Sequence, residues 1–176
     1  MSNRYRVAFI QSCWHKDIVD QFRISFDCQL RKLEQDQVHI DFFEAPGVVE
    51  IPLLADRCAR SSAYDIIVVC GLVVDHGIYR HEFVAQSVLD ATMRVQMSTN
   101  TPVIYGILTP QDFLSDGREE FFFQHFTLKG EEAAVACRKT IRNLALVTAA
   151  RPGLKDHQKS SIGRDDEIPS HHGSGK

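Results

Sequence analysis

A dense group of ionisable side chains follows a short apolar run in the middle of the chain. The run at residues 66–70 is rich in β-branched residues, which is typical of a strand buried in a parallel sheet. Apolar residues recur at helical spacing after the group, so we expect it on a loop between a strand and a helix. Imidazole can transfer protons near neutral pH, and a helix N-terminus favours an anion such as phosphate. A solvated loop would explain any one of these side chains, but the whole group at a strand end favours a site: Asp75, His76, Gly77, Tyr79, Arg80, His81 and Glu82.

Short apolar segments alternate with stretches of helical spacing along the chain. The predicted strands lie at residues 7–10, 38–43, 66–70 and 103–107. Strands that alternate with helices form a parallel sheet covered by helices on both faces. We therefore predict an α/β fold with three layers, in which ligands bind at the carboxyl ends of the strands. Four strands make a small sheet for so much helix, which favours assembly into oligomers.

Two other connections place candidate binding residues at strand ends. The one tryptophan, Trp14, follows the first strand, where a flat ring either fills the core or stacks on a planar heterocycle. Pro46 and Gly47 supply turn chemistry after the second strand and lead into a helix, whose first turn tolerates Pro52. Glu50 is either a surface charge favoured by the helix dipole or a ligand contact.

The last third of the folded chain carries weaker signals. Thr109 and Pro110, followed by an acid, predict a helix start directly after the fourth strand. Residues 121–126 are strongly aromatic and are expected in a loop or short helix near the surface. These aromatic side chains form a subunit interface or are buried within the monomer. The final helix is expected after Lys129 and Gly130.

The composition predicts one globular domain at residues 1–150 and a disordered polar tail at residues 151–176. A net charge of -3 without a basic stripe argues against a nucleic-acid partner. No apolar run is long enough for a signal segment or a membrane span. The 5 cysteines are scattered, so we expect reduced thiols and a cytoplasmic protein. The chain has no G-x-G-x-x-G motif after a strand, no P-loop and no cluster with metal-ligand spacing.

Three segments together resemble lumazine synthase, the penultimate enzyme of riboflavin synthesis, over roughly residues 5–149. They are the loop that ends at Trp14, the Ala-Pro-Gly-Val-Val-Glu-Ile-Pro sequence of residues 45–52, and residues 71–81. The resemblance implies a flavodoxin-like sheet and no metal or redox cofactor. It also implies condensation of 5-amino-6-ribitylaminouracil with 3,4-dihydroxy-2-butanone 4-phosphate to 6,7-dimethyl-8-ribityllumazine, phosphate and water. Active sites in this family lie between neighbouring subunits of a pentamer.

The resemblance assigns a substrate pocket by position. Trp14 would stack on the pyrimidine ring, where most members have phenylalanine, and Glu50 would bind the ribityl chain. Tyr105 of an adjacent subunit would close the pocket. The other implied pyrimidine contacts are Val48, Val49 and, through backbone groups, Leu72, Val73 and Val74.

Two departures from the family pattern leave alternatives open. Most members carry a histidine for proton transfer in the central motif, and an ungapped alignment places Arg80 there with His81 one residue later. The register favours Arg80 as the catalytic residue, whereas the chemistry favours His81. Arg80 could instead bind the phosphate. The Gly-rich phosphate segment after the fourth strand is also replaced, and the predicted phosphate contacts are Gly77, Ile78, His125 and Lys129.

These departures resemble the divergent second-type branch of the family, which we associate with decamers of two pentamers and with weaker catalysis. Three functions follow from the sequence. The first is the enzyme, and the second is a weakly catalytic carrier of lumazine or flavin, which Arg80 in the histidine register favours. The third is an unrelated flavodoxin-like domain that binds phosphate as a monomer. Turnover separates the first two functions, and sedimentation excludes the third.

Overall fold

The computed structural model describes residues 5–35, 37–75, 77–78 and 80–150, so the predicted tail lies outside the described residues. Its sheet has four strands in the order β2-β1-β3-β4, and every neighbouring pair is parallel. The strands are β1 (Tyr5–Ser12), β2 (Val38–Ala45), β3 (Ile66–Leu72) and β4 (Val103–Leu108). All predicted strands are confirmed, and each continues beyond its predicted C-terminal end.

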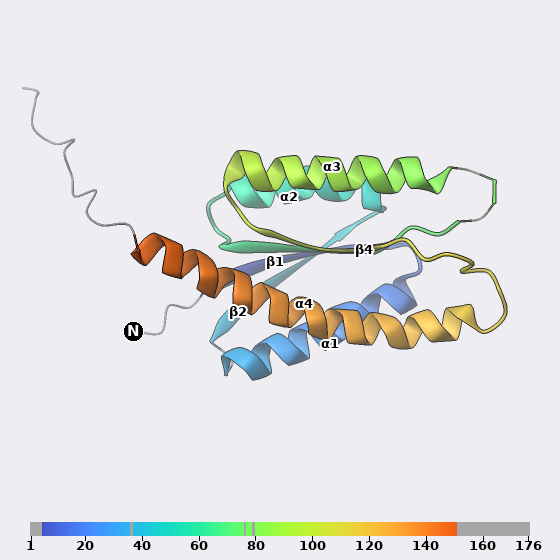
Figure 1. The fold of residues 1–176 in the computed structure, drawn as a ribbon, viewed down its shortest axis with the longest axis horizontal. Helices are drawn as coiled ribbons and strands as arrows, with labels where there is room; N and C mark the ends of the chain where they lie inside the picture. Colours follow the sequence, from blue (N-terminus) through green and yellow to red (C-terminus); the bar gives the residue numbers. More distant parts are fainter. Residues whose placement is uncertain (1–4, 36, 76, 79, 151–176) are drawn as a thin grey trace, which may run out of the picture.

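Helices cover both faces of the sheet, as the alternation of elements predicts (Figure 1). They are α1 (Lys16–Glu34), the 3-10 helix η1 (Val48–Glu50), α2 (Ile51–Arg60), α3 (His81–Thr99) and α4 (Arg118–Ala149). One buried cluster lies between the sheet and the pair α1 and α4, and a second lies beneath α2 and α3. The predicted three-layer, flavodoxin-like arrangement is therefore confirmed. None of the helices in the described part of the chain has the length and apolar character needed to cross a membrane.

The predicted helix start at Thr109 and Pro110 is wrong. The chain forms bends and turns there, and Asp112 has a left-handed φ of 52°. Phe113 turns into the core instead and stacks on Phe122, with 5.6 Å between the ring centroids. Burial of this side chain outweighs the local helix signal, which is a weak determinant by itself.

The final helix begins at Arg118 rather than after Gly130, which lies in its interior. Helix α4 crosses α1 closely at this glycine. A Cβ at Gly130 would lie 2.1 Å from Ser25 Oγ and 2.3 Å from the carbonyl oxygen of Phe22. The glycine is therefore required by helix packing and does not mark a helix boundary.

The structure divides the aromatic segment at residues 121–126, which is part of α4. Phe122 and Phe126 are buried, and Phe126 meets Phe22 at 6.4 Å between ring centroids. Phe121 is exposed. Burial within the monomer thus explains Phe122 and Phe126, and the interface hypothesis applies only to side chains such as Phe121.

Candidate functional site

The carboxyl ends of β1, β2 and β3 meet the beginning of α3 around a cavity of about 450 Å³, which we call the tryptophan cavity. Strands β1 and β3 are neighbours, and the chain winds outward from them in opposite directions along the sheet. Ligands of open α/β sheets bind at such a switch point. The lining residues are Trp14, His15, Pro46, Gly47, Val48, Val49, Glu50, Leu72, Val73, Val74, Arg80, His81 and Val84.

Gly71 allows the connection after β2 to lie against the end of β3. A Cβ at this position would come within 2.7 Å of Val48 Cγ1 and 2.8 Å of Ser12 Oγ. Any larger residue would push η1 away from the strand ends. The close approach places Val48, a buried side chain, in the wall of the cavity.

Backbone and ion-pair contacts hold the loop after β1 against β2. The Cys13 amide donates a hydrogen bond to the carbonyl oxygen of Ala45 at 3.1 Å. Lys16 Nζ donates to the carboxylate of Glu44 and lies 3.4 Å from Asp20 Oδ1. The hydrogen bond with Glu44 raises the pKa of Lys16, so this ammonium stays charged at neutral pH. These contacts fix the segment that carries the exposed indole.

Trp14 and Glu50 lie next to each other beside Gly47. The indole is 68% exposed, which excludes the core role for Trp14 within this chain. A Cβ on Gly47 would be 3.8 Å from Trp14 Nε1 and 3.1 Å from Glu50 Oε2. The Gly47 amide donates to Glu50 Oε2 at 2.9 Å, and no described residue hydrogen-bonds the other carboxylate oxygen. A flat apolar surface therefore adjoins a carboxylate that can accept hydrogen bonds from a ligand hydroxyl.

Arg80 and His81 stand at the beginning of α3. The guanidinium of Arg80 lies over the Phe83 ring at 5.6 Å from its centroid and is otherwise open to solvent. His81 is the first helical residue, and its side chain is 19% exposed. The first amide groups of α3 and the neighbouring guanidinium together favour an anion at this end of the cavity.

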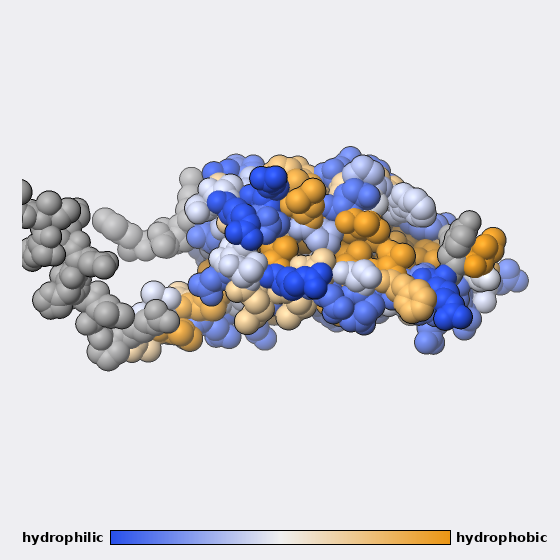
Figure 2. Space-filling view, turned by 90° about the horizontal axis from the view of Figure 1, so that it is seen from above, coloured by the Kyte–Doolittle hydropathy of each residue, from blue (hydrophilic) through white to orange (hydrophobic). Residues whose placement is uncertain are grey.

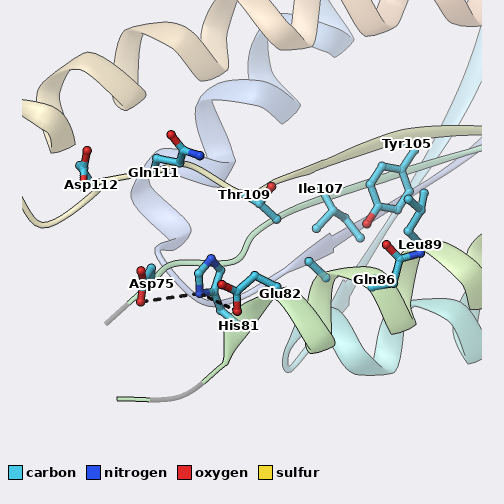
Figure 3. A pocket seen from close by; sticks show the side chains of 11 residues that line it. Asp75, His81, Glu82, Gln86, Leu89, Tyr105, Ile107, Thr109, Gln111 and Asp112 are labelled. Atoms are coloured by element: carbon cyan, nitrogen blue, oxygen red, sulfur yellow. Dashed lines mark ion pairs between the residues drawn. The ribbon is translucent and has the colours of Figure 1, made fainter. Parts of the chain in front are cut away.

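A second cavity, of about 600 Å³, lies between the beginning of α3, β4 and the segment after β4. We call it the tyrosine cavity (Figure 3). Burial raises the pKa of the Tyr105 phenol, which therefore keeps its hydroxyl proton. His81 lines both cavities. The other residues that line the tyrosine cavity are Asp75, Glu82, Ala85, Gln86, Leu89, Tyr105, Ile107, Thr109, Gln111 and Asp112.

The single chain brings together most, but not all, of the predicted site residues. Tyr105 lines the tyrosine cavity, whereas the exposed Gly77 and Ile78 line neither cavity of the described chain. His125 and Lys129 are on α4, across the sheet from α3. The residues gathered in the tryptophan cavity are Trp14, Val48, Val49, Glu50, Leu72, Val73, Val74, Arg80 and His81.

The side chains of His125 and Lys129 have partners within α4. The His125 ring stacks on Phe121 with 5.5 Å between centroids, and Lys129 Nζ lies 2.7 Å from Glu132 Oε2. Neither residue lines the tryptophan cavity of its own chain.

The sequence-based prediction omitted four residues that line the tryptophan cavity. Gly47 directly precedes Val48, Pro46 lies two residues before Val48, and Val84 lies one helical turn after His81, so closeness in sequence was the available signal. His15 follows Trp14 with a left-handed φ of 50°, and its ring meets the edge of Phe113 at 5.1 Å. Only its position beside Trp14 could have indicated it.

Large apolar side chains remain exposed near the tryptophan cavity and on the adjoining helices α2 and α3. Figure 2 shows apolar side chains gathered on this face between charged ones. Exposed apolar groups on this scale are typical of a surface that another molecule covers. They include Val49, Leu53, Ile78, Phe83, Met93 and Met97.

No three potential ligand side chains among the described residues converge as a metal site requires.

The chain is similar to one family of known proteins over most of its length. The family model of 6,7-dimethyl-8-ribityllumazine synthase matches residues 4–145. A 6,7-dimethyl-8-ribityllumazine synthase 2 of Pseudomonas syringae pv. tomato is 51% identical over 140 residues, which cover 79% of this chain and 82% of the relative. A protein of the same name from Bradyrhizobium diazoefficiens is 49% identical over 142 residues, 79% of this chain and 84% of the relative. A 6,7-dimethyl-8-ribityllumazine synthase of Rhodococcus erythropolis is 47% identical over 140 residues, covering 79% and 90%.

Proposed function

Because the chain belongs to the 6,7-dimethyl-8-ribityllumazine synthase family, we propose that it condenses 5-amino-6-ribitylaminouracil with 3,4-dihydroxy-2-butanone 4-phosphate. The products are 6,7-dimethyl-8-ribityllumazine, phosphate and water, in riboflavin synthesis. The names of the two most identical relatives reported above agree with the second-type branch of the family. The observation that carries the proposal is one cavity that combines an exposed indole, a carboxylate and an imidazole at a helix N-terminus.

The pyrimidine binds against the indole of Trp14, which is exposed and flat. Val48 and Val49 contact the ring, and the backbone of Leu72, Val73 and Val74 offers hydrogen-bonding groups where β3 ends. The ribityl hydroxyls donate to the carboxylate of Glu50. This arrangement is supported by the 2.9 Å hydrogen bond that holds Glu50 beside Gly47.

The phosphate of the second substrate binds near the beginning of α3. The helix N-terminus and Arg80 attract the anion, and the backbone of Gly77 and Ile78 contributes hydrogen bonds. His125 and Lys129 of a neighbouring copy complete the phosphate site. Their position on α4, away from this chain's own tryptophan cavity, supports their contribution to a neighbouring site.

His81 transfers protons during the condensation, and Arg80 acts on the phosphate. The pyrimidine amine attacks the ketone, a Schiff base forms, phosphate is eliminated, and the ring closes. Each step needs aligned reactants and a group that exchanges protons near neutral pH. The half-buried imidazole at the junction of the two cavities meets this need better than the exposed guanidinium, which stays charged.

The active site is shared between copies in a pentamer or in a dimer of pentamers. Tyr105 lines the tyrosine cavity of its own chain and does not line its tryptophan cavity. We therefore assign Tyr105 to the closure of a neighbour's tryptophan cavity. The exposed apolar side chains of α2 and α3 support coverage by that neighbour. We further propose that the protein acts in the cytoplasm, where reduced cysteines such as Cys28, exposed on α1, persist.

The test is lumazine formation from the two substrates, followed by absorbance. We expect His81→Ala to lower kcat about 100-fold, the lower limit of typical general acid-base catalysis. Arg80→Ala should mainly raise KM for the butanone phosphate. His39→Ala is the matched control, because this exposed histidine on β2 lies away from both cavities.

A larger loss of kcat in Arg80→Ala than in His81→Ala would reverse the two roles. A wild type that only matches the uncatalysed rate, yet binds 6,7-dimethyl-8-ribityllumazine tightly, would replace the enzyme by the carrier.

A further inference from the structure

The imidazole of His81 lies between two carboxylates. Nδ1 of His81 is 3.6 Å from Asp75 Oδ1 and 3.6 Å from Glu82 Oε2. Both contacts start at the same ring nitrogen, as the dashed lines in Figure 3 show. These distances are ion-pair contacts and exceed the length of a hydrogen bond. Catalytic hydrogen bonds often shorten to their working length when the reactants occupy the site.

The two carboxylates differ in how firmly they are held. Asp75 Oδ1, which faces the imidazole, also accepts a hydrogen bond from the Gly77 amide at 2.7 Å. The Glu82 side chain is 71% exposed, and its carboxylate accepts no hydrogen bond from the residues that the structure describes. An anchored acceptor loses less conformational entropy than a mobile one when it pairs with the imidazole. Asp75 is thus the better oriented of the two partners.

We propose that Asp75 is a positioning residue that keeps a proton on Nδ1 of His81 and turns Nε2 toward the reactants. The inference rests on the proposed function. The hydrogen bond at one ring nitrogen decides which nitrogen of a neutral histidine carries the proton. A carboxylate facing Nδ1 selects the Nδ1–H tautomer and leaves Nε2 as the basic nitrogen.

The proton transfers follow from this tautomer. As the amine nitrogen forms its bond to the ketone carbon, Nε2 of His81 takes one amine proton and the carbonyl electron pair moves to oxygen. His81 returns that proton to the oxygen. The oxygen leaves as water with the second amine hydrogen when the carbon–nitrogen double bond forms. The Asp75 carboxylate stabilises the transient imidazolium.

The test compares Asp75→Asn with the matched variant Glu82→Gln. Asparagine keeps an oxygen for the Gly77 amide but removes the negative charge from His81. We expect Asp75→Asn to lower kcat about tenfold or more while KM changes less than about twofold, because the variant loses the charge that stabilises the Nδ1–H tautomer and the imidazolium. Glu82→Gln should lower kcat less than Asp75→Asn does, because the Glu82 carboxylate is exposed and screened by solvent.

A second readout reports the tautomer directly. The protein is labelled with ¹⁵N at its 8 histidines, saturated with 6,7-dimethyl-8-ribityllumazine, and studied by NMR near neutral pH, with His81→Ala identifying the signals of His81. The proposal expects Nδ1–H in the wild type and in Glu82→Gln, and a shift toward Nε2–H in Asp75→Asn. A merely structural role for Asp75 would not move this equilibrium.

Nε2–H in the wild type overturns the proposal, as does an unchanged tautomer in Asp75→Asn. A larger loss of kcat in Glu82→Gln than in Asp75→Asn overturns it as well. Failure of the proposed function is a different result, namely no lumazine formation by the wild type. The NMR spectrum needs no turnover, so it tests the effect of Asp75 on the His81 tautomer even if the protein forms no lumazine.

Discussion

The two faces of the sheet are built in different ways. Between the sheet and the pair α1 and α4, large aromatic side chains are fully buried and contact one another. Gly130 brings the two helices so close that no Cβ fits between them. The buried phenylalanines of this layer are Phe9, Phe22, Phe26, Phe113, Phe122 and Phe126.

The layer beneath α2 and α3 buries smaller side chains and leaves large ones outside. Ala55, Val88 and Val95 point into the core, while Leu53 and Phe83 are mostly exposed. Both cavities border the beginning of α3. The comparison teaches that the α1–α4 face builds the aromatic core of the monomer, whereas the α2–α3 face borders both cavities.

The largest expected effect tests this division with two phenylalanines. Phe126→Ala empties a fully buried site on α4 and should lower the free energy of unfolding by about 4 kcal/mol at any protein concentration. Phe83→Ala, on the exposed side of α3, should cost less than about 0.5 kcal/mol in dilute protein. Its cost should grow with protein concentration as copies associate. Urea unfolding at several protein concentrations measures the free energy of unfolding of both variants.

A concentration-independent loss of several kcal/mol in Phe83→Ala would show that the α2–α3 face also stabilises the monomer. That result would remove the contrast between the two faces.

A smaller effect concerns the pH dependence of stability on the same two faces. Burial raises the pKa of the Cys137 thiol on α4 from 9.0 to about 12. Between these two values the folded state keeps a proton that the unfolded state releases. The contribution of this thiol to the free energy of unfolding is therefore fully present below pH 9 and is lost as the pH rises toward 12. The slope approaches about 1.4 kcal/mol per pH unit for one such group. Unfolding between pH 8 and about 11 measures this loss.

Cys137→Ala should reduce this slope, whatever it does to the absolute stability. Cys58 on α2 is the counterpart, since burial also raises the pKa of its thiol. The reduction should be smaller in Cys58→Ala than in Cys137→Ala. Equal slopes in both variants would contradict a more tightly closed α1–α4 layer.

The smallest effect sharpens the functional side of the comparison. Trp14→Ala should weaken binding of 6,7-dimethyl-8-ribityllumazine about tenfold, or about 1.4 kcal/mol, because a stacking surface is lost. The free energy of unfolding should stay within about 0.5 kcal/mol, since the indole is exposed. Calorimetric titration measures the affinity, and Trp14→Phe, which keeps an aromatic ring, is the control. Equal affinities of the wild type and Trp14→Ala would place the pyrimidine elsewhere.

Much of the fold could be predicted because its signals are local. Strand β3 is apolar throughout and every residue in it is buried, so its burial could be predicted from its residue types. The predictions failed after β4, where two local signals conflicted with packing. The cap-like Thr109 precedes turns because Phe113 enters the core, and Gly130 serves a helix crossing.

The candidate site could be predicted where its segments directly follow neighbouring strands. Residues after β1, β2 and β3 had to meet, since parallel strands end at one edge of the sheet. Tyr105 lies within β4 rather than after its end, and it lines a second cavity between β4 and the beginning of α3. The contact between Asp75 and His81 was not predicted, because residues on one irregular loop have no fixed spacing from which an orientation can be inferred.

The amino-acid sequence by itself determined the strands, the loops that carry the ionisable groups, and the similarity to the lumazine synthases. These features depend on residue types and spacings within short segments, so they can be recognised from the sequence alone. Only the tertiary structure decided where α4 begins, which aromatic side chains are buried, and which carboxylates face His81. Each of these depends on atoms brought together from separate segments or on the path of a loop, as when Ser25 and Phe22 leave room only for a glycine at position 130.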